Sequence, residues 1–376
     1  MPPTVSVLTP DAIARDLSLR DLTDPAAGPH AMQLLVEGAT AALRDRWRGE
    51  VVVRRGRPVV PVEDNYDRLR YEPDAISRDP RYTRYVSDTC LLRTHTSALV
   101  PPALRDLARR YVRDVLLVCP GIVYRRDSID RLHTGTPHQL DLWRVVARPM
   151  TDADLDGMIA TVVETLLPGL PHRCLPASHP YTENGRQVDV QADGEWVEIG
   201  ECGLAGRAVL AHAGLDTTRL SGLAMGLGLD RILMLRKGIP DIRLLRSADP
   251  RIAGQMLDLE PYRPASSQPA IRRDVSIVVE PGETPESVGD QVRDALGPDA
   301  ASVEQVEILA ATPAEELPPA AAERLGIRSG QTNVLLRVVL RHVDRTLTDR
   351  EANDLRDRIF AALHRGVSDP RRPPGR

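Results

Sequence analysis

Three segments of the chain bring together arginines, acids, carboxamides and glycines that can handle anionic groups. They are LLRTHTSAL (91–99), VYRRDSIDRLHTGTPHQLDLW (123–143) and GLAMGLGLDRILMLRKGIPDIRLLRSADPR (222–251). An arginine keeps its charge and can hold a phosphate through two parallel hydrogen bonds. Glycines in a strand let a ligand approach the backbone closely, although alone they can simply mark tight packing. Together the segments predict a site for phosphate and carboxylate groups.

The composition narrows the class of protein. A chain of 376 residues is long enough for two domains. Apolar residues make up 42% and charged residues 27%, and the formal net charge of −4 gives no basic signature of a nucleic-acid binder. The four cysteines form no CxxC pair, so we expect neither a disulfide framework nor structural zinc. The N-terminus carries Asp11, Asp16 and Asp21 and no stretch is long and apolar, so we expect a cytoplasmic protein without a membrane span.

Periodicity in the N-terminal part of the chain predicts helices and paired strands. Residues 31–47 and a segment beginning near Pro101 repeat apolar residues at helical spacing. β-Branched runs on either side of a glycine predict a hairpin at 51–60. We expect the polar residues 62–90 to form surface connections. LLVCPGIVYRR and LDLWRVVAR predict antiparallel strands joined by a loop at 128–137.

The C-terminal part of the chain predicts a separate small module. Before it, DADLDGMIATVVETLLPGL predicts a helix, and RQVDVQADGEWVEIG predicts a hairpin that turns at Asp193-Gly194. The Pro- and Ser-containing residues 258–270 predict a linker. The order strand, helix, strand, strand, helix over 271–366 predicts a ferredoxin-like module, and we expect a disordered tail at 367–376.

Together with PASHPYTENGRQVDVQADGEWVEIGECG (176–203), the three segments resemble the catalytic core of phenylalanyl-tRNA synthetase, a class II aminoacyl-tRNA synthetase. PAIRRDVSIVVE and HVDRTLTDREAND resemble the ferredoxin-fold anticodon-binding domain that ends the single-chain, mitochondrial-type enzymes. The resemblance implies an α+β protein, with an antiparallel sheet flanked by helices and a C-terminal ferredoxin-like domain. The implied parts are an N-terminal helix and hairpin region (1–61), a catalytic domain (62–257), the linker (258–270), an anticodon-binding-like domain (271–366) and the tail (367–376).

The resemblance also implies which residues bind ATP. Arg125 stands where class II enzymes place the arginine on the α-phosphate and the amino-acid carboxylate, and Arg231 stands where they place the arginine on the γ-phosphate. Both are therefore candidate catalytic residues. Gly226 and Gly228 would let the backbone approach the nucleotide. Glu198 is a candidate ligand for Mg²⁺, which prefers carboxylate oxygen. Glu198 and Asp127 are also implied contacts of the nucleotide. Pro137 is a further implied contact and stands in place of an aromatic residue that stacks on adenine.

The same resemblance implies a pocket for the amino acid. Its polar head would be held by His95, Ser97, Gln139 and Asp141. A buried ammonium needs acceptors such as a carboxylate and an amide oxygen. The family usually has Glu where this chain has Asp141, so the charge is set back by one methylene. Ala224 would leave room for a side-chain ring.

The pocket departs from the family pattern, and its main departures replace apolar aromatic side chains with more polar ones. The family's FPF, whose rings pack on the phenyl group of the substrate, reads His179-Pro180-Tyr181 here. A GMVHP-like stretch is replaced by residues 203–206. An aromatic pair contributes about 0.5–1.5 kcal/mol beyond burial, and a buried imidazole or phenol instead requires hydrogen-bond partners. The substitutions favour a polar or modified side chain, such as a hydroxylated or heteroaromatic amino acid; the alternative is sequence drift in a working phenylalanine enzyme.

Three functions remain open from the sequence. The first is ATP- and Mg²⁺-dependent activation of an amino acid through an aminoacyl-adenylate, with transfer to tRNA by a monomer in protein biosynthesis. The second transfers the activated group to a small amine or carrier. The third is a non-catalytic RNA-binding paralogue, although such a protein has no need of both Arg125 and Arg231. Residues 263–376 contain 16 Arg and Lys against 18 Asp and Glu, so a tRNA-binding face there depends on local clustering of arginines. The candidates are Arg341, Arg345, Arg350, Arg356 and the tail arginines.

Overall fold

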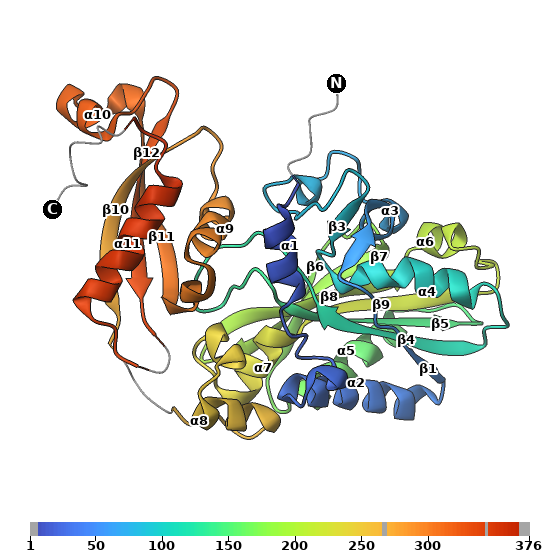
Figure 1. Ribbon diagram of the computed structural model, residues 1–376. Coiled ribbons are helices and arrows are strands. Elements are labelled where there is room, and N and C mark those ends of the chain that lie inside the picture. Colours follow the sequence, from blue (N-terminus) through green and yellow to red (C-terminus); the bar gives the residue numbers. More distant parts are fainter. Residues whose placement is uncertain (1–6, 265–268, 343–344, 368–376) are drawn as a thin grey trace. The chain divides into compact units, whose positions relative to one another are not determined.

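A computed structural model describes residues 7–264, 269–342 and 345–367, and divides the chain into two compact units (Figure 1). The core unit contains residues 1–125, 136–245 and 253–262. The C-terminal unit contains residues 126–135, 246–252 and 263–376. The predicted linker at 258–270 and the predicted tail at 367–376 lie partly outside the described residues, and the domain boundaries given above remain predictions.

The core unit is built on a seven-stranded sheet in the order β1-β4-β5-β9-β8-β7-β6. All neighbouring strands are antiparallel except β1 and β4. The strands are β1 (Glu50–Val53), β4 (Asp114–Ile122), β5 (His138–Val146), β6 (His172–Pro176), β7 (Thr182–Ala192), β8 (Glu195–Ala205) and β9 (Ser221–Gly228). This sheet confirms the predicted antiparallel architecture of an α+β protein.

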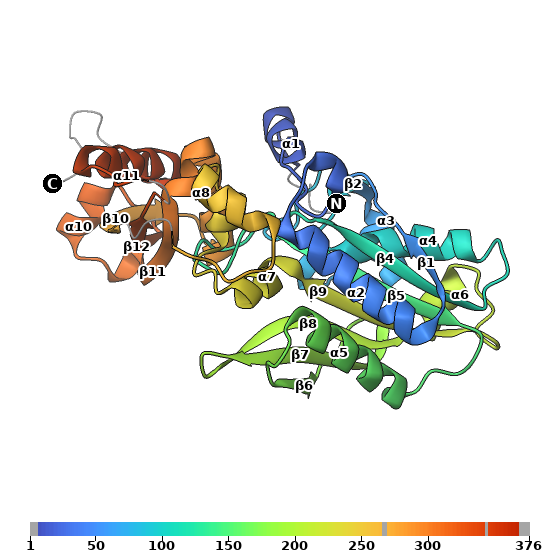
Figure 2. The same cartoon turned by 90° about the horizontal axis from the view of Figure 1, so that it is seen from below.

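Helices cover both faces of the sheet (Figure 1, Figure 2). One face carries α2 (Ala31–Trp47) and α5 (Asp152–Leu166), and the other carries α4 (Val100–Leu107) and α6 (Arg207–His212). The helix predicted at 31–47 has these bounds in the structure. α5 begins where Thr151 and Asp154 form a capping box, which satisfies two backbone donors of its first turn. The remaining helices of this part of the chain are α1 (Pro10–Leu17), α3 (Val62–Asn65), α7 (Leu229–Lys237) and α8 (Pro250–Ala253).

The hairpin predicted at 51–60 is wrong. β1 pairs in parallel with β4, whereas β2 (Val59–Pro61) pairs with β3 (Cys90–Leu92) in a separate two-stranded sheet. The flanking residues extend these two separate pairings: the N–H of Arg54 donates to Val118 on β4 at 2.8 Å, and the carbonyl of Pro58 accepts from the N–H of Arg93 after β3 at 2.9 Å. A Cβ at Gly56 would lie 2.5 Å from Leu99, so the turn also packs tightly against a neighbouring element.

The surface role predicted for residues 62–90 is also wrong in part. Tyr66 and Leu69 are fully buried, and the Tyr66 hydroxyl donates to the Ser77 carbonyl at 2.6 Å. The hydroxyl of Thr83 donates to the same carbonyl. Hydrogen bonds to backbone thus allow a polar-looking segment to fold inward, which composition alone does not reveal.

The hairpin predicted to turn at Asp193-Gly194 is confirmed by β7 and β8. Both turn residues have positive φ, 51° and 86°, as a two-residue hairpin turn of the primed type requires. The glycine-rich segment 222–251 contributes β9 and α7, and the helix ends at Gly238 in the left-handed conformation. Glycines in the left-handed region mark the ends of these elements in the sequence, and the structure has the elements at those positions.

The C-terminal unit contains a three-stranded antiparallel sheet in the order β10-β12-β11. Its elements are β10 (Ile271–Val279), α9 (Pro285–Leu296), β11 (Val303–Pro313), α10 (Pro319–Leu325), β12 (Thr332–Leu340) and α11 (Asp349–Leu363). The predicted strand and helix order is confirmed, with α10 as an additional short helix. Capping boxes start both long helices, at Thr284 for α9 and at Thr348 for α11. Apolar side chains from all three strands and from α9 and α11 form one buried core.

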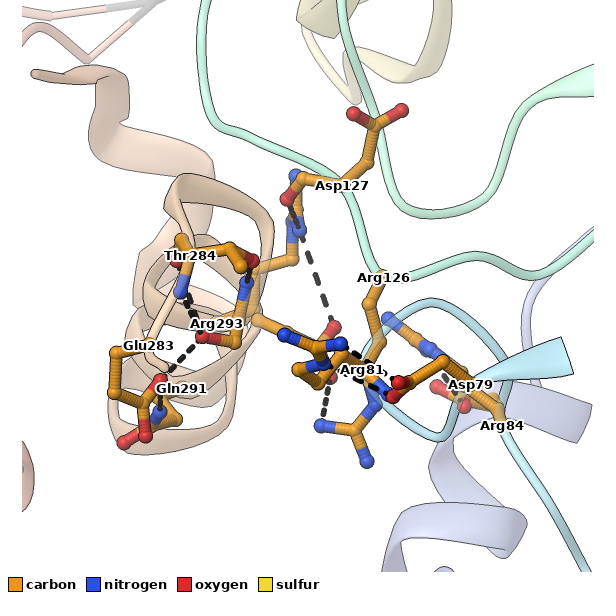
Figure 3. Close-up of polar contacts among 12 residues, drawn as sticks. Asp79, Arg81, Arg84, Arg126, Asp127, Glu283, Thr284, Gln291 and Arg293 are labelled. Atoms are coloured by element: carbon orange, nitrogen blue, oxygen red, sulfur yellow. Dashed lines mark hydrogen bonds and ion pairs between the residues drawn. The ribbon is translucent and has the colours of Figure 1, made fainter. Parts of the chain in front are cut away.

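The segment 126–135, which follows β4 in the sequence, belongs to the C-terminal unit. Ile129 lies in the apolar core of that unit, and its carbonyl accepts from the backbone N–H of Val306 at 2.8 Å. Arg293 on α9 donates to the carbonyls of Asp127 at 2.6 Å and Ser128 at 2.7 Å (Figure 3). A Cβ at Gly289 would lie 2.6 Å from the Asp127 carbonyl, so only glycine allows this approach. The sequence predicted a plain loop here.

Candidate active site

Small residues along β9 create a floor for a ligand in the core unit. Ala224, Gly226 and Gly228 alternate along the strand, so they lie on the same face of the sheet. A Cβ at Gly226 would meet only the Asp141 carboxylate, at 3.9 Å, and a Cβ at Gly228 only a backbone oxygen, also at 3.9 Å. The face above both glycines is therefore unfilled, which fits the predicted approach of a substrate to the backbone.

Side chains of the two neighbouring strands line this floor. On β5, Gln139, Asp141 and Trp143 are the register partners of Gly228, Gly226 and Ala224. On β8, Glu201 is the register partner of Gly226. Residues directly opposite in antiparallel strands project to the same face. β5 and β8 therefore supply polar groups on either side of the small residues of β9.

Asp141 is the best-anchored acid of the site. Its carboxylate accepts from the hydroxyls of Thr96 at 2.7 Å and Ser97 at 2.9 Å, and from the indole N–H of Trp143 at 3.3 Å. The backbone N–H of Thr96 donates to Gln139 Oε1 at 3.3 Å. Burial raises the pKa of Asp141 to about 6, although the three donors oppose this change. The predicted Ser97, Gln139 and Asp141 are thus brought together around one acceptor group.

His95 stands beside this group in an aromatic environment. Its ring stacks on Tyr71 at 5.6 Å and meets the edge of Tyr66 at 6.1 Å. In the part of the chain that the structure describes, neither ring nitrogen has a hydrogen bond of standard geometry. Burial, and then the charge of Arg125, lower the pKa of His95 to about 3, although the Asn65 backbone acts in the opposite direction. The imidazole is therefore neutral and can hydrogen-bond a ligand.

The replaced FPF segment lies at one end of the floor. The ring of Tyr181 stacks on Trp143 at 6.0 Å and on His179 at 5.9 Å, and lies 6.3 Å from Tyr71. Ala224 is only 1% exposed and shares a buried cluster with Trp143. The space that the sequence assigned to a substrate ring above Ala224 is thus lined by the indole and phenol of the chain itself.

The two predicted catalytic arginines both act electrostatically on Glu198. Arg231 Nη1 donates to the Glu198 carbonyl at 2.8 Å, and Arg125 Nε donates to the Thr94 carbonyl at 2.7 Å. Burial, and then the neighbouring carboxylate of Glu201, raise the pKa of Glu198, whereas both arginines lower it. Both guanidinium groups thus lower the pKa of one carboxylate on β8, the strand next to β9.

Two predicted nucleotide contacts have mainly structural partners. The carbonyl of Pro137 accepts from the backbone of Val123 at 2.8 Å. Asp127 belongs to the C-terminal unit, where its carbonyl binds Arg293 and its carboxylate accepts from the Ser128 N–H at 2.9 Å. Their contacts with a nucleotide remain predictions. Among the described residues, no group of three or more His, Cys, Asp or Glu side chains is arranged to hold a metal.

The structure adds site residues that the sequence analysis missed. Thr96 and Trp143 bind the Asp141 carboxylate, Tyr71 stacks on His95, and Glu201 lies opposite Asp141 across Gly226. The spacing of Trp143 from Asp141 is a usable signal, since residues two apart in a strand share a face. Tyr71 offers none, because it lies in a segment without strand or helix periodicity.

Comparison with known proteins identifies the family. The family described as "tRNA synthetases class II core domain (F)" matches residues 48–256, more than half of the chain. The chain belongs to the class II aminoacyl-tRNA synthetases. Its catalytic core is of the type found in the alpha subunit of phenylalanine–tRNA ligase, as the similarity to individual relatives shows.

Two similar proteins are phenylalanine–tRNA ligase alpha subunits of Prochlorococcus marinus. This synthetase is 37% identical over 191 residues to the phenylalanine–tRNA ligase alpha subunit of Prochlorococcus marinus strain NATL2A, a match covering 51% of this chain and 56% of the relative. It is 35% identical over 239 residues to that of strain MIT 9313, covering 62% and 69%. The chain thus spans little more than half the length of the first of these relatives.

A solved pyrrolysyl tRNA synthetase from Desulfitobacterium hafniense also resembles this synthetase. The two share 17% sequence identity with a TM-score of 0.45, and the match covers 58% of this chain and 73% of the other. Within the described ranges of the synthetase, every helix is too short or too polar to cross a membrane.

Proposed function

We propose that this synthetase activates an amino acid with ATP and transfers it to tRNA. The observation that carries the proposal is that Arg125 and Arg231, from distant segments, both act on the Glu198 carboxylate, on the strand next to the open glycine floor of β9. Activation joins an amino-acid carboxylate to the α-phosphorus of ATP and breaks the bond to the β-phosphate, which releases pyrophosphate. Two anions must therefore be held in line while charge develops on phosphate. Two fixed guanidinium groups meet that requirement.

In this proposal each arginine has a separate task. Arg125 binds the amino-acid carboxylate and the α-phosphate, and Arg231 binds the γ-phosphate. Mg²⁺ would be bound chiefly by phosphate oxygens and water, with Glu198 as a protein ligand. Burial and Glu201 raise the pKa of Glu198, and both arginines oppose this shift and so favour the ionised form that a metal needs. Mg²⁺ supplies charge neutralisation of the triphosphate when bound.

The amino-acid head would bind at the anchored carboxylate. Asp141 accepts the α-ammonium group, and Gln139 and the neutral His95 complete its surroundings. Asp141 holds its position because Thr96 and Ser97 already donate to it. The replaced FPF segment supports the inference that the substrate side chain is polar, since His179 and Tyr181 present an imidazole and a phenol.

ATP–pyrophosphate exchange with a mixture of amino acids tests the activation step. We expect exchange in the wild type, and a loss of at least about 100-fold in Arg125→Ala and Arg231→Ala, because each removes a charge-assisted contact to the transition state. Arg109→Ala is the matched control, since the Arg109 side chain is 80% exposed and pairs only loosely with Asp106 at 3.7 Å. Exchange that survives in either site variant would refute the proposed chemistry.

The acceptor has weaker structural support than the activation step. Several arginines proposed for a tRNA face form ion pairs: Arg341 with Glu304 at 2.6 Å and Arg345 with Glu351 at 2.8 Å. Such pairing favours the second candidate, transfer to a small amine or carrier. Filter binding of total tRNA at low and moderate salt separates the two, because phosphate contacts weaken steeply with salt. The monomeric state and the cytoplasmic location remain part of the proposal.

A further inference from the structure

We propose that the amino-acid substrate has a short side chain ending in a hydrogen-bond donor, such as an amine, and that Glu201 is the residue that selects it. This inference rests on the proposed amino-acid activation and deepens it. It concerns Glu201, which lies in the segment 176–203 but was not a candidate residue in the sequence, and whose carboxylate lies opposite Asp141.

The first step is the row of residues across three strands. Asp141 on β5, Gly226 on β9 and Glu201 on β8 are consecutive register partners, so their side chains share one face. Neighbouring strands lie about 4.8 Å apart, which places β5 and β8 about 10 Å apart. Gly226 contributes no side chain between them, and a Cβ there would lie 3.9 Å from both oxygens of Asp141. Two carboxylates therefore flank an open floor.

The second step is the direction that a substrate side chain can take. With its ammonium at Asp141, the side chain has two ways along this face. One leads over Ala224, where Trp143 is fully buried and Tyr181 stacks on it at 6.0 Å. The other leads over Gly226 toward Glu201. The first route is occupied by side chains of the synthetase itself, so the geometry favours the second.

The third step is what surrounds the second route. The pKa of the Tyr71 phenol is raised, first by burial and also by the charges of Glu201 and Asp141. The pKa of the Tyr181 phenol is raised well above its ordinary value by burial, by Tyr71 and by the same two carboxylates. The two rings lie 6.3 Å apart, and the charges of both acids act on both phenols. Aromatic rings and carboxylates together favour a donor or a cation over an apolar group.

The fourth step is how Glu201 is held. His179 Nε2 lies 3.1 Å from a Glu201 oxygen, and His179 Nδ1 lies 3.1 Å from the Thr182 hydroxyl. The His179 side chain is only 7% exposed, whereas that of Glu201 is 43% exposed. His179 therefore lies beside Glu201 as a positioning residue, although among the described residues its Nε2 makes no hydrogen bond of standard geometry, and the partly exposed carboxylate can accept from a ligand. A phenylalanine side chain offers that carboxylate no donor and would only desolvate it.

Amino acids matched in size test the proposal. ATP–pyrophosphate exchange would be measured with 2,4-diaminobutyrate and ornithine, with their apolar counterparts norvaline and norleucine, and with phenylalanine. We expect the wild type to prefer the amines by about 10- to 100-fold in kcat/KM, as expected for hydrogen bonds to a charged group. Glu201→Gln keeps the shape and removes the charge, so the preference should fall about tenfold or more while KM for ATP stays unchanged.

Controls separate selection from general damage. Glu195→Gln changes an exposed acid at the start of the same strand and should leave the preference intact. His179→Phe should weaken the preference less than Glu201→Gln, and His179→Gln should partly restore it, because a merely structural role would not follow hydrogen-bonding capacity. Thermal unfolding of each variant verifies that it is folded. A wild type that activates norvaline or phenylalanine best, or a folded Glu201→Gln variant with an unchanged preference, would overturn the proposal.

A binding measurement keeps this test distinct from that of the proposed function. Calorimetric titration with the same amino acids requires no adenylate chemistry. Binding that prefers the amines without any pyrophosphate exchange would refute the proposed activation and retain the selection by Glu201. Pyrophosphate exchange with a preference for apolar side chains would support the proposed activation and refute the selection by Glu201. Absence of both binding and exchange would refute both.

Discussion

Asparagine in place of Asp141 removes a buried charge while nearly keeping the shape of the side chain. The carboxylate is 2% exposed, and three donors from Thr96, Ser97 and Trp143 surround it. Burial nevertheless raises its pKa from 3.8 to about 6. The donors therefore only partly replace the water that an ionised carboxylate loses. A ligand ammonium would provide the missing compensation.

The size and sign of the effect follow from the two pKa values. The difference between 3.8 and about 6, at about 1.36 kcal/mol per pKa unit, corresponds to roughly 3 kcal/mol near pH 7. Between these values the folded protein binds more protons than the unfolded chain, so this penalty is absent below about pH 4 and grows as pH rises through 6. We expect Asp141→Asn to stabilise the free protein at neutral pH, and roughly 1 kcal/mol less so at pH 5 than at pH 7.5.

Urea unfolding followed by tryptophan fluorescence measures this effect. Trp47, Trp143 and Trp196 all lie in the core unit, so the signal reports that unit and not the C-terminal one. The free energy of unfolding would be compared between wild type and variant at pH 5 and pH 7.5. Asp45→Asn is the control, because the side chain of Asp45 is 70% exposed and its loss should have little effect at either pH.

The pH dependence of the difference in unfolding free energy between wild type and variant tests the raised pKa better than the size of that difference at one pH. Asparagine also alters the three hydrogen bonds, but that alteration is the same at both pH values. A difference between wild type and variant that does not change from pH 5 to pH 7.5 would refute a raised pKa at Asp141. The variant should also lose activation of every amino acid, since it has no charge for the ammonium group.

Three further outcomes follow from the same structure. In the wild type, KM for the amino acid should rise as pH falls below about 6, because protonation of Asp141 removes the acceptor for the ammonium; a pH-independent KM from 5 to 8 would contradict this. Arg293→Ala should speed hydrogen exchange in residues 126–135 by at least about tenfold, since two backbone hydrogen bonds are lost, whereas Arg356→Ala should not. Thr348→Ala should weaken the start of α11 by about 1 kcal/mol, seen as about fivefold faster exchange in peptide 349–363, and unchanged exchange there would refute a role for the cap.

Much of the fold could be predicted because its elements carry local signals. The helix at 31–47, the turn at Asp193-Gly194 and the cap at Thr348 are set by residues close to them in the sequence. The failed hairpin at 51–60 shows the limit of such signals. β1 and β2 have strand-forming residues, but their partners are distant, and no local rule distinguishes pairing with each other from pairing with β4 and β3.

The candidate site divides in the same way. Arg125, Gln139, Asp141 and Arg231 stand in motifs, and the structure places Gln139 and Asp141 beside the small residues of β9. Tyr71 lies outside these segments, and Glu201 lies within the segment 176–203 but is not marked there, because their relation to the site arises from packing and from the register of β8 with β9. Predicting them requires the alignment of strands that are far apart in the sequence, which composition and periodicity leave undetermined.

The membership of residues 126–135 in the C-terminal unit limits how this synthetase can be divided. A chain shortened to end at residue 262 would retain this stretch but lose Arg293, the partner strand at Val306 and the apolar surroundings of Ile129. The stretch begins directly after Arg125, so a shortened chain would disturb the backbone next to a proposed catalytic group. Any exchange of the C-terminal module between relatives would have to carry a matching 126–135 stretch with it. Each unit is compact in space but is built from separate stretches of the sequence. A change in the C-terminal module would therefore have to be matched by a change in residues 126–135.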